Sequence, residues 1–271
     1  MNILRSILPC IMGIKIAGAA TLSPFAKDQV IFHLTLDEIN GTTFEDNAGN
    51  FDGTLIGTHN GFVDGFVRKG VSFDKTSTYQ FTGGVEVASP NQLFTSVNDA
   101  DFTVSLVTSI EDVNSVGGIY SFGTQSPVDV RYDGPNGGLQ MRFWGPGHVG
   151  TRVANIIPKS EMQTDTLYFI TVVWDKTNLE TRGYVNGVLK ATLSLESGID
   201  YFNENVEMVI GAIEYNGSYQ TTLQGTVDEF VMLNTALEDS AVSDIYEFYQ
   251  RFYYTLENDR DIDDIKESLA P

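Results

Sequence analysis

Cysteine is nearly absent from this chain. The single thiol, Cys10, has no partner for an intramolecular disulfide in a sequence of 271 residues. Stability must therefore come from a hydrophobic core or from a bound metal ion. Hydrophobic residues make up 42% of the sequence and aromatic residues 11%, so the chain has the material for a core. Its length suits one large domain.

Positive charge is also scarce. Sixteen Lys and Arg residues stand against 36 Asp and Glu, which gives a net charge of −20. Nucleic acids and anionic membranes are bound by clustered cations, so this balance excludes both as partners. No apolar run approaches the roughly 20 residues that a membrane-spanning helix needs. The partners that remain are other protein subunits or glycans.

Several motifs of catalysis are missing. The three histidines, His33, His59 and His148, lack the spacing of paired metal ligands, and no serine lies in a G-x-S-x-G elbow. No glycine-rich turn precedes a helix, which argues against a phosphate site. The sequence therefore predicts a protein that is not an enzyme.

Residues 1–27 form an apolar N-terminal segment with two interpretations. Arg5, an apolar run and the small residues Ala17-Gly18-Ala19 are ingredients of a secretory signal. Pro9 and Lys15 interrupt the run, as expected for a degenerate signal peptide or for an apolar arm. Such an arm would dock on its own domain or on a neighbouring subunit.

Residues 28–236 alternate between apolar and polar side chains, as half-buried strands do. Leu139, Met141 and Phe143 are one example. Asn186-Gly187 between two such segments predicts a tight hairpin, because both turn positions need positive φ. We predict an all-β, antiparallel two-sheet sandwich of about a dozen strands.

Residues 237–257 change to helical spacing, and the acidic residues 258–271 follow as a tail. The helix carries an aromatic stripe made by Phe248, Tyr249, Phe252 and Tyr253. One interpretation is a lid packed on the sandwich. The other is a contact between subunits, because the stripe is larger than docking of one helix requires.

Six short phrases occur in a fixed order along the chain. They lie at residues 34–57 (LTLDEINGTTFEDNAGNFDGTLIG), 70–74, 101–110, 167–175, 183–195 and 223–245 (LQGTVDEFVMLNTALEDSAVSDI). Together they resemble the concanavalin-A-like, laminin-G-like jelly-roll family over about residues 28–248. The resemblance implies a jelly-roll sandwich with one C-terminal helix. It does not imply one function, since the fold carries lectins, enzymes and adhesion modules.

The resemblance also implies a structural calcium site. In laminin-G-like relatives an acid near the first strand and the Asp of the closing strand meet beside an irregular loop. The matching positions are Asp37, Glu38, Asp46, Asn47 and Asp228. Calcium takes six to eight oxygens, which carboxylates, Asn and loop carbonyls supply. The alternative is that Asp46 and Asn47 cap a turn and that Asp228 accepts backbone hydrogen bonds.

A glycan site is the second candidate. The laminarinase-type signature Glu-x-Asp-x-x-Glu of enzymes with this fold is absent. Sugars stack on exposed rings and take hydrogen bonds from amide and charged side chains. Candidate ligand-binding residues are Tyr132, Asn136, Arg142, Trp144, His148, Tyr215 and Asn216. The alternative is that Trp144 plugs the edge of the core, whereas Trp174 is expected inside it.

Two functions follow from these features. The first is a non-catalytic structural or adhesion protein in a larger assembly, such as a virion or a cell-surface layer, with a homo- or hetero-oligomeric state. The alternative is a carbohydrate-binding lectin module. An enzyme that acts on glycosides ranks below both. Both place the protein outside the cell or on a virion or cell surface.

Overall fold

The structure is a computed structural model that describes most of the chain between residues 25 and 257. The described ranges are 25–26, 28–38, 40–49, 51–66, 68–87, 100–122, 128–144, 150–197, 208–215 and 218–257, with the backbone alone at 215 and 252–257. The predictions for residues 1–24 and for the tail 258–271 lie outside the described residues.

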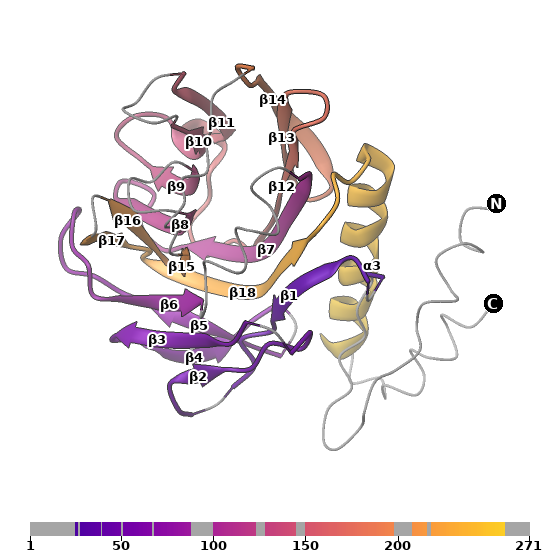
Figure 1. Ribbon diagram of the computed structural model, residues 1–271. Helices are drawn as coiled ribbons and strands as arrows, with labels where there is room; N and C mark the ends of the chain where they lie inside the picture. Colours follow the sequence, from indigo (N-terminus) through magenta and orange to yellow (C-terminus); the bar gives the residue numbers. More distant parts are fainter. Residues whose placement is uncertain are drawn as a thin grey trace.

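Two antiparallel eight-stranded sheets form the domain (Figure 1). Sheet A has the order β14 (Val188–Ser194), β13 (Glu180–Val185), β12 (Tyr168–Asp175), β7 (Phe102–Ile110), β18 (Gly225–Leu233), β5 (Lys69–Phe73) and β4 (Gly61–Asp64). β1 (Val30–Leu34) also pairs with β18, so the first and last strands of the sandwich lie side by side.

Sheet B lies opposite sheet A. Its order is β11 (Arg152–Pro158), β10 (Gly138–Phe143), β9 (Val128–Asp133), β8 (Val116–Phe122), β15 (Met208–Ile210), β6 (Gly83–Val87), β3 (Gly53–Gly57) and β2 (Thr43–Phe44). A separate hairpin of β16 (Ala212–Tyr215) and β17 (Ser218–Thr222) packs against β8, and a 3-10 turn, η3, spans Lys159–Glu161.

The core lies between the two sheets and is rich in aromatic rings. Trp174 of sheet A stacks on Phe102 at 5.8 Å and on Phe143 of sheet B at 5.3 Å, measured between ring centroids. Such pairs stabilise the fold beyond the area they bury. Trp174 is therefore a core residue, as predicted.

Helix α3 (Asp239–Glu257) covers the outer face of sheet A (Figure 1). Val242, Ile245 and Tyr249 are buried against outward-facing residues of the sheet. Phe25, just before β1, joins the same apolar cluster, with its ring centroid 6.4 Å from that of Tyr249. The helix thus packs as a lid on its own domain.

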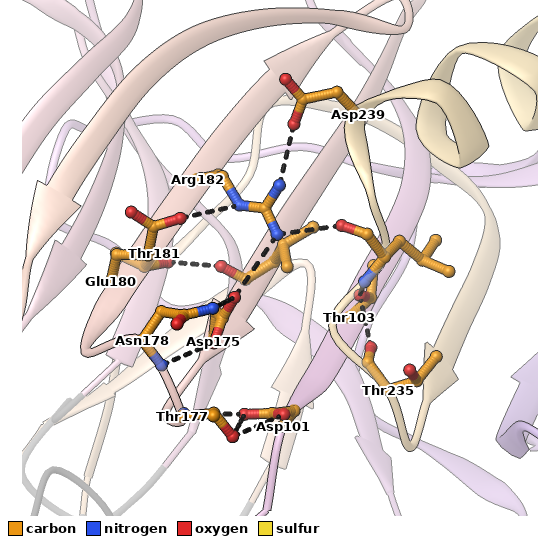
Figure 2. Close-up of polar contacts among 12 residues, drawn as sticks. Asp101, Thr103, Asp175, Thr177, Asn178, Glu180, Thr181, Arg182, Thr235 and Asp239 are labelled. Carbon is orange, nitrogen blue, oxygen red and sulfur yellow. Dashed lines mark hydrogen bonds and ion pairs between the residues drawn. The ribbon is translucent and has the colours of Figure 1, made fainter.

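A polar anchor fixes the start of this helix (Figure 2). The guanidinium of Arg182 donates to the Asp239 carboxylate at 2.8 Å and to the backbone carbonyl of Leu237 at 3.0 Å. Tyr184 donates its hydroxyl to the same Asp239 oxygen at 2.6 Å. Arg182 also lies 3.7 Å from Asp175, so one guanidinium joins two strands and the helix.

The predicted sandwich and C-terminal helix are confirmed. The Asn186-Gly187 turn has φ of 51° and 74°, the positive values that this hairpin requires. The predicted number of strands was too low, because several strands such as β2 and β15 have only two or three residues. Strands this short leave little alternation to detect in the sequence.

Candidate functional site

Charged side chains line the outer face of sheet B where β9 pairs with β10. On β9, Val128, Val130 and Tyr132 face the core, so Asp129, Arg131 and Asp133 point to the other side. The register places Asp129 opposite Arg142 and Arg131 opposite Gln140. We call Asp129, Arg131, Asp133, Gln140, Arg142 and Trp144 the polar face.

Arg142 is the centre of the polar face. Its guanidinium carbon lies 4.4 Å from the centre of the Trp144 ring, in a cation–π contact. Its Nε lies 3.8 Å from Oδ2 of Asp129. Burial lowers the pKa of Arg142, although the nearby Asp129 acts in the opposite direction. The ring of Trp144 is partly exposed, and Arg142 links it to the acid beneath.

Asp129 is a buried carboxylate, with 1% of its surface exposed. Within the described part of the chain, no group donates a hydrogen bond to either of its oxygens. Burial raises its pKa, and the two neighbouring arginines offset this only in part. A buried carboxylate without donors is costly, so a water molecule or a ligand hydroxyl is the natural completion of this site.

A second ion pair and an amide pair extend the polar face toward β11. Arg131 pairs with Asp133, whose other oxygen accepts from the Asn136 side chain at 3.0 Å. Gln140 donates to the exposed Asn155 at 3.0 Å. Each of the two arginines of the face is thus committed to an acid.

The β16–β17 hairpin borders the polar face on the other side. The backbone N–H of Glu214 donates to the hydroxyl of Ser121, which lies opposite Asp129 in the β8–β9 pair. A Cβ at Gly118 would lie 2.3 Å from the Ala212 carbonyl carbon, so only glycine allows this approach. The side chain of Glu214 is buried, with 1% of the residue exposed.

The structure brings together two of the predicted ligand-binding residues, Arg142 and Trp144. Tyr132 was placed wrongly: it is a core residue, 1% exposed, and its hydroxyl bonds the Val113 carbonyl. Desolvation raises its pKa to about 12. Asn136 lies in the β9–β10 turn, at the end of the hairpin away from Trp144. His148, Asn216 and the side chain of Tyr215 lie outside the described residues.

Sequence reasoning missed Asp129, Arg131 and Glu214. The available signal was the alternation of Asp129 and Arg131 with the apolar residues Val128 and Val130, which places charges on one face of a strand. Glu214 carried no such signal, because its position depends on the hairpin folding over β8.

The predicted calcium ligands are occupied by backbone donors. Asp46 accepts N–H groups of His33, Ala48 and Phe51 at 2.8–2.9 Å. Asp228 accepts the N–H of Phe66 at 2.6 Å.

The remaining predicted ligands do not complete a metal cage. Asp37 accepts the N–H of Lys69 at 3.0 Å, Glu38 accepts that of Glu45, and Asn47 is exposed. In the described ranges, no group of three or more His, Cys, Asp or Glu is arranged to hold a metal ion. Bound calcium stays a prediction. The positions of these residues in the structure do not fit it.

Tyr249, one of the residues of α3 predicted to contact another subunit, points into its own domain. Its ring is 2% exposed, and its hydroxyl lies 3.2 Å from Oε2 of Glu229, which also lies 2.8 Å from Nε2 of His33. Phe248 is half-buried and packs at the edge of the same cluster. The side chains of Phe252 and Tyr253 lie outside the described residues. Tyr249 is therefore an intramolecular contact and not an interface residue.

No helix in the described part of the chain is long and apolar enough to cross a membrane. No curated protein matches the chain.

Among solved structures, domain 4 of AbnA, a GH43 extracellular arabinanase from Geobacillus stearothermophilus, in complex with arabinotriose, superposes with a TM-score of 0.59. The identity is 17%, over 80% of this chain and 98% of that one.

Two further neighbours are parts of larger proteins. Trypanosoma rangeli sialidase matches with a TM-score of 0.61 and 15% identity over 88% of this chain and 35% of its own. The binding domain of botulinum neurotoxin DC, in complex with rat synaptotagmin II, matches with a TM-score of 0.60 and 15% identity. The match covers 82% of this chain and 52% of that one. The chain thus spans about a third and a half of these two, and such identities show the fold alone.

The sequence profile of the concanavalin A-like lectin/glucanases superfamily matches residues 81–243. These residues run from just before β6 to the fifth residue of α3 and include the whole polar face. Together with the two-sheet sandwich, the match shows that this chain belongs to the concanavalin A-like lectin/glucanases superfamily.

Proposed function

We propose that this domain is a non-catalytic carbohydrate-binding module whose ligand lies on the polar face of sheet B. The observation that carries the proposal is Asp129, a buried carboxylate without hydrogen-bond donors in the described residues, beside the Arg142–Trp144 pair. Sugar hydroxyls are donors, and sugar C–H faces stack on indole rings. The polar face combines an acceptor and a ring at adjacent positions.

The fold neighbours support this proposal by analogy. The arabinanase domain was solved with arabinotriose and the neurotoxin binding domain with rat synaptotagmin II, so two domains of this shape bind other molecules. We propose that such a recognition module acts outside the cell or on a surface. Absence of catalysis is part of the proposal.

A glycan array followed by calorimetry tests the proposal. The intact chain should bind a subset of glycans, and Trp144→Ala should weaken binding about 5- to 150-fold if a sugar gains as much from stacking on the ring as a nucleic-acid base does, about 1–3 kcal/mol. Tyr79→Ala is the matched control, because Tyr79 is an aromatic residue with 70% exposure in the β5–β6 connection. Its binding should equal that of the unmodified chain. An empty array would contradict the proposal.

A second candidate is a subunit of a larger assembly. It is favoured by β14, the edge strand of sheet A, where Val188 and Leu189 are 56% and 40% exposed. Exposed apolar edge strands pair readily with other chains. Light scattering distinguishes the two: an oligomer that dissociates on Val188→Lys with Leu189→Lys supports assembly, and a monomer at all concentrations opposes it.

A further inference from the structure

Both arginines of the polar face are already neutralised by acids of the same face. Arg131 pairs with Asp133, and Arg142 lies 3.8 Å from Asp129 while its guanidinium carbon lies over the Trp144 ring. The exposed fractions of the Asp129 and Asp133 side chains are 1% and 2%, so these acids depend on their arginines for compensation. The face carries two charges of each sign.

An anionic ligand has little to gain here. Carboxylate and sulfate groups are recognised by guanidinium groups that are free to make paired hydrogen bonds. Drawing Arg142 or Arg131 toward such a ligand would leave Asp129 or Asp133 buried without compensation, which is strongly unfavourable. The net charge of −20 adds long-range repulsion at low salt.

An uncharged glycan meets the opposite situation. The two Asp129 oxygens are buried and lack donors in the described part of the chain, so a hydroxyl group that reaches them completes the site while Arg142 keeps its place. The half-exposed Trp144 offers a surface for the apolar side of the sugar. Resting on the proposed carbohydrate-binding function, we propose that the site selects neutral, hydroxyl-rich glycans and rejects sugars that carry carboxylate or sulfate groups.

Matched glycan pairs test this selectivity on the full chain. Lactose is compared with sialyllactose, and xylohexaose with the same chain bearing a glucuronate branch, by array and then by calorimetry at low and high salt. For every pair with measurable binding, the neutral member should bind at least about tenfold tighter, the scale of one hydrogen bond to a charged group. Its affinity should change little with salt.

Two variants assign the selectivity to the site. Asp129→Asn should weaken neutral-glycan binding about tenfold. Glu247→Gln removes the same charge from an exposed position on α3 and should leave binding unchanged. If Asp129→Asn does not fold, the comparison of neutral and anionic ligands on the unmodified chain still decides.

The outcomes separate the two proposals. Equal or tighter binding of the anionic member overturns the selectivity and leaves the carbohydrate-binding function standing. If the folded Asp129→Asn variant binds neutral glycans as tightly as the unmodified chain, Asp129 does not contact the glycan. Failure of every glycan to bind overturns the proposed function itself, and the selectivity with it.

Discussion

Arg182 on β13 donates a hydrogen bond of 2.8 Å from Nη1 to Oδ1 of Asp239, the first residue of α3 (Figure 2). The same guanidinium reaches the Leu237 carbonyl and the buried Asp175. This contact fixes where the helix begins and so places its apolar face on sheet A.

Removing Arg182 should therefore destabilise the whole domain. Arg182→Gln leaves Asp175 buried without its cation, and breaking such a pair costs about 3 kcal/mol. Urea unfolding measures the loss. Arg152→Gln is the matched control, because its partner Glu196 is about half-exposed and surface pairs contribute less than about 1 kcal/mol. Equal losses in the two variants would contradict the anchor.

The aromatic stripe of α3 should behave as part of the monomer. Tyr249→Ala removes a buried ring that packs on Phe25, Phe66 and Phe169, so we expect a loss of about 3–4 kcal/mol in unfolding free energy. The molecular mass in solution should stay the same. A folded variant of lower mass would show instead that Tyr249 joins subunits.

Asp37 should make stability depend on pH. Burial raises its pKa to about 6, whereas an unfolded Asp titrates near about 4. Between these values the folded state binds more protons, so stability falls as pH rises from about 4 to about 6 and stays lower above. Asp37→Asn should be more stable than the unmodified chain at pH 7.5, by about 1 kcal/mol after allowance for solvent. The gain should vanish below pH 4; a gain independent of pH would contradict this origin.

Adding calcium tests whether the ion site that the sequence predicts exists, although the structure does not arrange its residues as a metal cage. A structural ion should raise the melting temperature. At a free calcium concentration one hundred times the dissociation constant, the folded state gains about 2.7 kcal/mol of stability. Because Asp46 and Asp228 already accept backbone N–H groups, we expect identical melting curves in calcium and in chelator. A rise that Asp228→Asn abolishes would support the calcium site.

Local patterns explain which parts of the fold were predictable. The alternation in Leu139, Met141 and Phe143 and the Asn186-Gly187 turn depend on neighbouring residues alone, so strands and hairpins followed from the sequence. The pairing of β1 with β18 joins residues about 200 positions apart. No local rule gives that pairing, which only the family resemblance implied, and its register was not predicted.

The candidate site was predictable only in part for the same reason. Arg142 is near the end of β10 and Trp144 is the first residue after this strand, two positions on, so their proximity could be predicted from the spacing. Tyr132 was chosen by residue type, although it has the same parity as the core residue Val130. Asp129 becomes a partner of Arg142 only through strand pairing, and Glu214 comes from a hairpin that packs against β8.

The indole N–H signals of the two tryptophans give the most direct test of the central claim. Trp144 lies on the polar face and Trp174 lies in the core, 3% exposed, so the second serves as an internal control. The signals are assigned with Trp144→Phe and followed by NMR while a neutral oligosaccharide from the array is added. We predict a saturable shift of the Trp144 signal with no change at Trp174. Saturable binding that leaves the Trp144 signal in place would contradict the proposed site.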